Sequence, residues 1–142
     1  MSVQRSGKER LTLYLRHVNN YGEKQKVKFE GVNDAMCFAN FSKYMYKFDL
    51  ESGDHHLDIH RSHQKYSGFS WKFKDKTRLF TFTVLPFCLC SAGHIFTKIV
   101  RVVLKYWRTL GIPIVVYLDD GWGAAENFTI CEKMSLQVRS DF

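Results

Sequence analysis

Residues 112–123 read Ile112-Pro-Ile-Val-Val-Tyr-Leu-Asp-Asp-Gly-Trp-Gly123. The β-branched and aromatic residues before Asp119 predict a strand, and the Gly-x-Gly after Asp120 predicts a turn. The two adjacent carboxylates are thus expected at the tip of a β-hairpin. Two anionic groups side by side repel each other unless cations neutralise them, and oxygen ligands suit hard divalent ions. Asp-Asp-Gly is also a common surface turn, so this interpretation needs support from elsewhere in the chain.

A third carboxylate has a similar setting. Asp49 falls within a second predicted strand, residues 45–50, which precedes Ser52 and Gly53. It lies 70 residues before Asp119 (119 − 49), which allows the two strands to be neighbours with other elements between them. Three aspartates on adjacent strand ends can hold two metal ions about 3.5–4 Å apart, which clamp the attacking and leaving oxygens of a phosphoryl transfer.

The composition indicates one globular domain. The chain has 142 residues, of which 45% are hydrophobic and 15% aromatic, enough for a core and too apolar for disorder. No apolar run approaches the ~20 residues of a membrane span, and the polar N-terminus lacks the apolar core of a signal peptide. We therefore expect an intracellular protein with no membrane partner. In that setting its cysteines are expected to be free thiols: Cys37, Cys88, Cys90 and Cys131.

The charge of the chain favours a polyanionic partner. The formal net charge is +7 and the pI is near 9.3, which is suggestive of nucleic acid. Basic residues gather in residues 1–28 and again between residues 72 and 78. Each cluster is equally consistent with a solvated surface.

The order of predicted elements indicates an α+β fold with mostly antiparallel pairing. We expect strands at residues 11–15, 45–50, 69–74 and 79–84, with a hairpin turn at Asp75 and Lys76, before the hairpin of residues 112–123. Residues 16–22 and 85–91 are expected to be a turn and a loop. Helices are expected at residues 33–44, 94–110 and 126–142. The first would begin at Asn33 as N-cap, with Met36, Cys37 and Phe41 facing inward.

The predicted helix 94–110 carries two stripes and is ended by Gly111 and Pro113. Apolar residues recur at helical spacing and predict the helix: Ile95, Ile99, Val102, Val103, Tyr106 and Leu110. Basic residues follow at steps of three, four and three: Lys98, Arg101, Lys105 and Arg108. The basic stripe is expected to face either a nucleic-acid backbone or solvent.

Five blocks of this sequence, in order, resemble reverse transcriptases of retroelements, most closely those of DIRS-like retrotransposons and next those of gypsy-like elements. The blocks are residues 10–19 (Arg-Leu-Thr-Leu-Tyr-Leu-Arg-His-Val-Asn), 47–60, 64–71 (Gln-Lys-Tyr-Ser-Gly-Phe-Ser-Trp), 82–87 (Phe-Thr-Val-Leu-Pro-Phe) and 117–120 (Tyr-Leu-Asp-Asp). The resemblance implies a single, truncated reverse transcriptase domain over residues 1–142. It would hold a fingers-like part, residues 1–44, and a palm-like part, residues 45–142, without thumb or ribonuclease H.

The resemblance also implies a reaction and a site. The reaction is template-directed addition of deoxynucleoside triphosphates to a primer 3′-hydroxyl on RNA or DNA, with two Mg²⁺ ions, for which Mn²⁺ is a possible substitute. Asp49, Asp119 and Asp120 would be the catalytic, metal-binding residues. The residues that would bind the nucleotide are Lys8, Arg10, Leu50, Asp54, Phe87 and Cys88.

Several positions depart from the pattern of the resembled family. Asp54 stands where the family has an aromatic residue that excludes the ribose 2′-hydroxyl, and Cys88 stands where it has glycine. Gly93 replaces a proline, and Tyr14 replaces an aspartate. These departures predict weak or absent activity, so the alternative is an inactive, degenerate palm fragment that only binds nucleic acid, in a salt-dependent manner.

A remote alternative is a metal-dependent hydrolase. On a strand, alternating side chains share one face, and Asp54, His56, Asp58 and His60 alternate. With His55 and His63 nearby, they would form a His/Asp set for zinc or iron. Polar residues of a surface strand and loop are the simpler interpretation, since no glutamate is placed as a base.

Overall fold

The computed structural model describes residues 2–3, 9–10, 13–39 and 42–141, with side chains from residue 13 onward. These form two units that interleave along the sequence. One, here called the sheet unit, comprises residues 26–53 and 94–142. The other, the hairpin unit, comprises residues 1–25 and 54–93. The division into fingers-like residues 1–44 and palm-like residues 45–142 stays a prediction.

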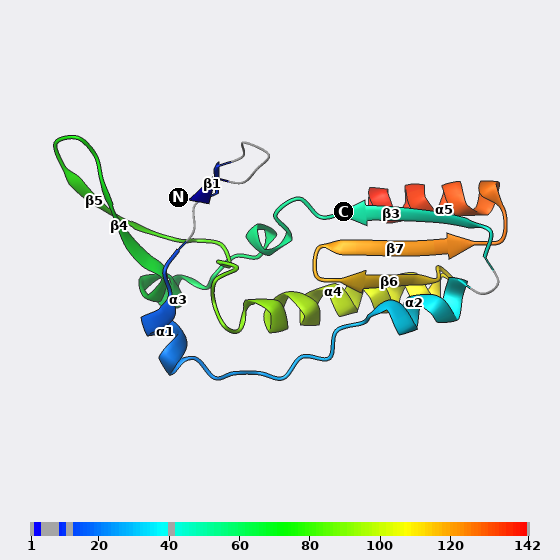
Figure 1. The fold of residues 1–142 in the computed structure, drawn as a ribbon, viewed down its shortest axis with the longest axis horizontal. Helices are drawn as coiled ribbons and strands as arrows, with labels where there is room; N and C mark the ends of the chain where they lie inside the picture. Colours follow the sequence, from blue (N-terminus) through cyan, green and yellow to red (C-terminus); the bar gives the residue numbers. More distant parts are fainter. Residues whose placement is uncertain (1, 4–8, 11–12, 40–41, 142) are drawn as a thin grey trace. The chain divides into compact units, whose positions relative to one another are not determined.

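The sheet unit is built on three antiparallel strands, β3 (Tyr44–Asp49), β7 (Asp120–Ala125) and β6 (Ile114–Tyr117), in the order β3-β7-β6 (Figure 1). Helix α5 (Phe128–Ser140) packs against β3 and β7, and α2 (Val32–Ala39) packs against β6 and β7. The predicted α+β fold with antiparallel pairing is confirmed.

Two glycines fix the contact between β3 and β7. Gly121 is paired with Phe48 and Gly123 with Tyr46, and each aromatic ring lies over the glycine opposite. A Cβ atom at Gly121 would be 2.0 Å from Cζ of Phe48, and one at Gly123 would be 2.3 Å from Cζ of Tyr46. The Gly-x-Gly that predicted a turn is therefore part of the strand, where it makes room for two rings.

Helix α4 (Ala92–Thr109) buries a different face from the one its predicted apolar stripe implied. Its buried side chains in the sheet unit are Phe96, Val100, Leu104 and Trp107. The rings of Trp107 and Phe48 meet edge to face, with centroids 6.2 Å apart. Apart from Val103, the residues that predicted the helix are exposed by 36% or more: Ile95, Ile99, Val102, Tyr106 and Leu110. Two apolar stripes share this helix, and periodicity alone does not say which one meets the sheet.

The other predicted helices are confirmed with shorter bounds. Asn127 caps α5 by accepting a hydrogen bond from the Ile130 amide at 2.9 Å. Helix α2 begins at Val32 rather than after an Asn33 cap. Met36 and Cys37 are exposed, so their predicted inward orientation is wrong. Phe41, also predicted inward, lies outside the described residues.

The hairpin unit holds β1 (Ser2–Val3), β2 (Glu9–Arg10), α1 (Arg16–Tyr21), α3 (Arg61–Gln64), the short 3₁₀ helix η2 (Lys65–Ser67), and the antiparallel hairpin β4 (Gly68–Lys72) and β5 (Thr77–Thr81). A further 3₁₀ helix, η1 (Gly53–His56), begins at the boundary of the two units. The β4–β5 hairpin matches the prediction within a few residues at each end. Stacked Phe69 and Phe80, with centroids 5.5 Å apart, hold its two strands together.

The predicted strand at residues 11–15 is wrong in its described part, and the predicted turn after it is helix α1. Leu13 and Leu15 are buried while Tyr14 is 80% exposed, so the alternation is real. Among the described residues no strand pairs with this segment, and alternation without a partner strand to hydrogen-bond with does not make a strand.

No helix in the described ranges is long and apolar enough to cross a membrane.

We predict that Gly121→Ala destabilises the protein by about 1–3 kcal/mol, because a methyl group would overlap the Phe48 ring and force it to move. Chemical denaturation measures the change. Gly31→Ala is the matched control, because a Cβ there meets no atom within 4 Å. The double variant Gly121→Ala/Phe48→Leu should lose less than the sum of the two single changes; additive losses would contradict the ring-over-glycine contact.

Tyr46 provides a second prediction. Its hydroxyl is buried without a hydrogen-bond partner, and burial, together with the nearby Cys131, raises its pKa from 10.0 to about 12. Because the folded pKa is the higher one, the stability linked to this group is present below pH 10 and is lost as pH rises from 10 to 12.

Tyr46→Phe should therefore raise the free energy of unfolding at pH 7 by about 1 kcal/mol, since an unsatisfied buried hydroxyl is removed. It should also abolish the part of the stability loss between pH 10 and 12 that comes from this group. Denaturation across that pH range tests both points. Tyr44→Phe is the control on the same strand, because Tyr44 is 43% exposed; equal effects of the two changes would contradict the role of burial.

Candidate active site

The carboxylates lie on the β6–β7 hairpin and on its neighbour β3. Tyr117 pairs with Asp120, so the turn consists of Leu118 and Asp119 alone. Leu118 has a φ of 52°, in the left-handed region that costs a non-glycine residue roughly 1–2 kcal/mol. Such strain persists only where the surroundings impose it, and it is common at functional sites.

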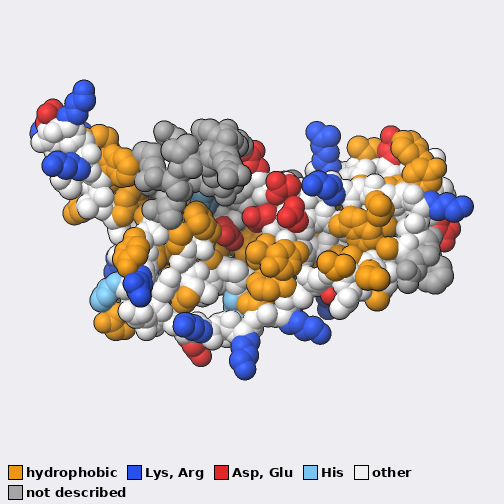
Figure 2. All heavy atoms as spheres, viewed as in Figure 1, with side chains coloured by type: hydrophobic (Ala, Val, Ile, Leu, Met, Phe, Trp, Pro, Cys, Tyr) orange, Lys and Arg blue, Asp and Glu red, His pale blue; other side chains and the backbone are white. Residues whose placement is uncertain are grey.

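Asp49 and Asp120 are directly opposite each other on neighbouring strands. They are register partners at the end of the β3–β7 ladder, and both are exposed. Residues in this relation have Cβ atoms about 4.5–5.5 Å apart, and like charges so placed destabilise a sheet. No ion pair or hydrogen bond relieves either carboxylate in the described part of the chain. The space-filling view shows acidic side chains gathered over the end of β3 and the β6–β7 turn (Figure 2).

Asp119 is held beside the segment that follows β3. Its carbonyl oxygen accepts a hydrogen bond from the Leu50 amide at 2.9 Å. A Cβ at Gly53 would lie 2.6 Å from Oδ1 of Asp119 and 2.7 Å from Cζ of Phe96. Only a glycine at position 53 therefore lets the carboxylate and the ring approach the chain this closely. The sequence predicted three clustered aspartates, and the structure places them at one end of the sheet.

The donor atoms at this end of the sheet suit a divalent cation. Asp49 and Asp120 offer unpaired carboxylate oxygens, the ligands that Mg²⁺ prefers. As arranged, however, the described residues contain no group of three or more His, Cys, Asp or Glu side chains that could hold a metal ion. Two of the three predicted ligands are thus opposed, while the third, Asp119, lies close to Gly53.

Leu50 connects this site to a groove between β3 and α5. Besides donating to Asp119, it lines a hollow of about 550 Å³ together with Asp49, Tyr46 and Arg139. Its predicted role in nucleotide binding stays a prediction.

The hairpin unit carries three other residues that were predicted to bind nucleotide. Phe87 is 49% exposed, while Cys88 and Asp54 are half-buried. The loop around Cys88 is fixed by Asn19 of α1, whose amide donates to the Cys88 carbonyl and accepts from the Cys90 amide, both at 2.9 Å. Asn19 belongs to the block of residues 10–19, but the sequence pattern does not predict this contact between distant segments.

The roles of the two residues predicted to bind the triphosphate stay predictions. Lys8 lies outside the described residues, and Arg10 is described only as a backbone position in β2, opposite Ser2 of β1.

The histidine-rich segment does not form the strand on which the hydrolase alternative depended. His55 and His56 belong to η1, Asp58 forms an isolated bridge with Val84, and His60 caps α3. His60 Nδ1 contacts the Ser62 hydroxyl at 2.8 Å. The shared face predicted from alternation is therefore wrong.

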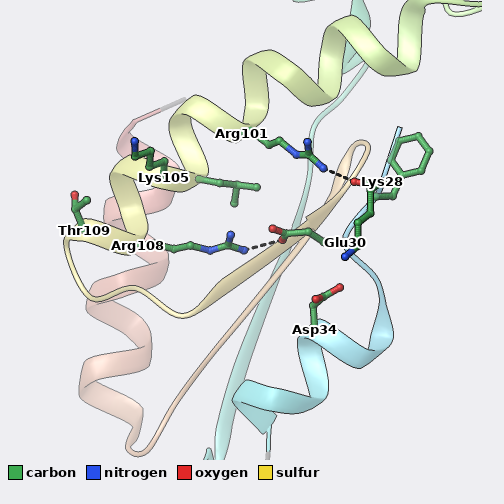
Figure 3. Close-up of a pocket in the computed structure, with 9 residues that line it drawn as sticks. Lys28, Glu30, Asp34, Arg101, Lys105, Arg108 and Thr109 are labelled. Carbon is green, nitrogen blue, oxygen red and sulfur yellow. Dashed lines mark hydrogen bonds and ion pairs between the residues drawn. The ribbon is translucent and has the colours of Figure 1, made fainter. Parts of the chain in front are cut away.

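Of the four basic residues in the predicted stripe of α4, two bond to another segment of the chain and two are exposed to solvent. Arg101 and Arg108 contact residues 28–30 and line a groove of about 590 Å³ that also contains Lys105 and Asp34 (Figure 3). Lys98 and Lys105 are exposed. The four residues together therefore do not form the free stripe that their spacing suggested.

The chain is similar to known proteins in sequence and in fold. Over 84% of its length the chain is similar to the genome polyprotein of Petunia vein clearing virus, with 32% identity over 121 residues for both the Shepherd and the Hohn isolates. It spans only 5% of those polyproteins. It matches no protein-family model.

A solved structure is similar over 95% of the chain, with a TM-score of 0.77 and 24% identity. It is a foamy viral protease-reverse transcriptase in complex with double-stranded DNA, and the chain covers 22% of it. The chain thus has the fold of a segment of a reverse transcriptase-bearing protein. This agrees with the resemblance to reverse transcriptases, but it does not bear on the DIRS-like or gypsy-like assignment.

We predict that Asp120→Asn raises Tm by about 1–3 °C without divalent ions, because it removes the like-charge repulsion from Asp49. Mg²⁺ should stabilise the wild-type protein more than the variant, because a bound ligand stabilises only the state that binds it. Differential scanning calorimetry with and without Mg²⁺ measures both effects. Glu132→Gln, an exposed change on α5, is the control; a lower Tm for Asp120→Asn would contradict the predicted repulsion.

Proposed function

We propose that this chain is a fragment of the polymerase palm of a retrotransposon reverse transcriptase, DIRS-like in its motifs. The proposed reaction is template-directed addition of deoxynucleotides to a primer 3′-hydroxyl. The observation that carries the proposal is the opposition of Asp49 and Asp120, two exposed carboxylates without a cationic partner, next to a strained Leu118-Asp119 turn. The similarity in fold to a reverse transcriptase-bearing protein supports it.

The proposed roles of the residues follow from the resemblance to reverse transcriptases. Asp49, Asp119 and Asp120 would hold two Mg²⁺ ions, which when bound favour the deprotonated primer hydroxyl and stabilise the departing pyrophosphate. The primer 3′-oxygen attacks the α-phosphorus of the nucleotide, a new P–O bond forms, and the bond to the β-phosphate breaks. The resemblance gives Phe87 and Cys88 a role in nucleotide binding and Lys8 and Arg10 a role in triphosphate binding, and these roles stay predictions.

A second candidate is a nucleic-acid-binding fragment without catalysis. The observation that favours it is that the described acidic side chains do not form a ready metal site as they stand. The departures at Asp54 and Cys88 point the same way. Basic side chains remain available for a nucleic-acid backbone, among them Lys72, Lys74 and Lys76 of the exposed β4–β5 hairpin.

Primer extension on an RNA template, with Mg²⁺ and separately with Mn²⁺, tests the proposal. We expect extension by the wild-type protein and a loss of at least about 100-fold in Asp49→Asn and Asp119→Asn, because each change removes a metal ligand. Asp75→Asn, which removes a charge from the loop of the β4–β5 hairpin, is the control and should retain activity.

The same preparations should be tested for binding to a primer–template duplex at several salt concentrations. Binding that weakens with salt but no extension under any condition would reject catalysis and favour the binding fragment. No salt-dependent binding at all would reject both candidates.

A further inference from the structure

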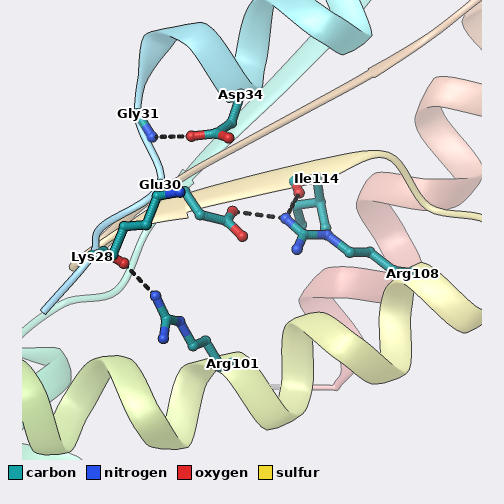
Figure 4. A network of polar contacts seen from close by, with 7 residues as sticks. All are labelled: Lys28, Glu30, Gly31, Asp34, Arg101, Arg108 and Ile114. Atoms are coloured by element: carbon teal, nitrogen blue, oxygen red, sulfur yellow. Dashed lines mark hydrogen bonds and ion pairs between the residues drawn. The ribbon is translucent and has the colours of Figure 1, made fainter.

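We infer that residues 28–30, here called the strap, are a positioning device for the carboxylate hairpin: Arg101 and Arg108 of α4 hold the strap so that it fixes the Leu118-Asp119 turn. The catalytic part of this inference rests on the proposed function, whereas the positioning itself does not. The residues lie within the sheet unit and are seen together in Figure 4.

Two arginines anchor the strap. Arg101 donates from Nη2 to the carbonyl oxygen of Lys28. Arg108 donates from Nη2 both to Oε2 of Glu30 and to the carbonyl oxygen of Ile114, each at 2.7 Å. Ile114 is the first residue of β6, so a single guanidinium joins the strap, the helix and the strand that leads to the carboxylates.

The strap reaches the residue before the turn through the ring of Phe29. The ring of Phe29 lies against that of Tyr117, with centroids 5.4 Å apart, and Tyr117 is the residue before the turn. Glu30 and Leu118 line the same narrow crevice beneath α4, with Phe96, Val100 and Leu104. Neighbouring strap residues thus contact the helix and the end of β6.

The turn needs support of this kind. The two-residue turn places Leu118, which is not glycine, in the left-handed region, so contacts that hold the ends of the turn offset this strain. Strand β6 is an edge strand, with β7 as its neighbour in the sheet, so strand pairing supports it from one side. Phe29 of the strap contacts Tyr117 at one end of β6, and Arg108, which holds Glu30 of the strap, bonds to Ile114 at the other end.

The Glu30–Arg108 pair is suited to this role. The side chains of Arg108 and Glu30 are 39% and 21% exposed, so solvent and salt screen their attraction less than that of a fully exposed pair. A partly exposed ion pair still adds little stability, so its expected role is to fix the geometry of the strap.

Hydrogen exchange followed by mass spectrometry tests the strap in the full chain. We expect Arg108→Gln and Phe29→Leu to speed exchange in residues 114–120 by about fivefold, because each removes one local support of the turn. Arg108→Lys should restore part of the protection. Lys105→Gln is the matched control, since it removes a charge from the same helix and groove without touching the strap.

The outcomes separate the strap from general destabilisation. If exchange in residues 128–140 of α5 rises equally, or if Lys105→Gln has the same effect as Arg108→Gln, the inference is overturned. Should Arg108→Gln fail to fold, Phe29→Leu and Arg108→Lys carry the test.

Primer extension by the same variants tests the catalytic part. We expect kcat to fall about tenfold with little change in KM for the nucleotide, because a misplaced carboxylate weakens the transition state more than substrate binding. Faster local exchange in a protein without polymerase activity would uphold the positioning and reject the proposed function. An unchanged kcat in an active protein with faster exchange would reject the catalytic role of the strap.

Discussion

The contact of the Phe48 and Tyr46 rings with Gly121 and Gly123 determines how β3 meets β7. A side chain at either glycine would occupy the same space as a ring, so the register of the two strands is fixed by shape as well as by hydrogen bonds. A slip of one residue would place a ring against Trp122 and move Asp49 away from Asp120. The opposition of the two carboxylates is a direct consequence of this packing.

The arrangement brings costs that a purely structural sheet would avoid. Two like charges face each other, Leu118 adopts a left-handed conformation, and the Tyr46 hydroxyl is buried without a partner. All three occur on β3, on β7 or in the turn that joins β6 to β7. Local violations of the usual rules are expected where a site is selected for chemistry rather than for stability, which is consistent with the proposed function of these strands.

The support for the site comes from outside the sheet. Trp107 of α4 meets the Phe48 ring edge to face. Arg101 and Arg108 of the same helix fix the strap, whose Phe29 contacts Tyr117. One helix therefore holds both β3 and β6 in place. Two of its basic residues, Arg101 and Arg108, anchor the strap. These two side chains are therefore less available to a nucleic-acid partner than the regular spacing of basic residues along the helix suggests.

Much of this could be predicted from the sequence, because short-range patterns encode it. The helix of residues 92–109, the β4–β5 hairpin and the Asp-Asp hairpin follow from periodicity, β-branched content and turn residues, and so does the presence of an acidic cluster. Which stripe of α4 is buried, the rings over Gly121 and Gly123, and the anchoring of Glu30 by Arg108 were not predictable. The ring contacts and the Glu30–Arg108 pair join residues that are 60 or more positions apart. Which apolar face of α4 is buried is decided by packing alone. The sequence by itself thus determined the local elements and the chemistry of the carboxylates. The tertiary structure decided which elements and side chains meet, because contacts between distant segments depend on the shapes that pack together and not on a local sequence pattern.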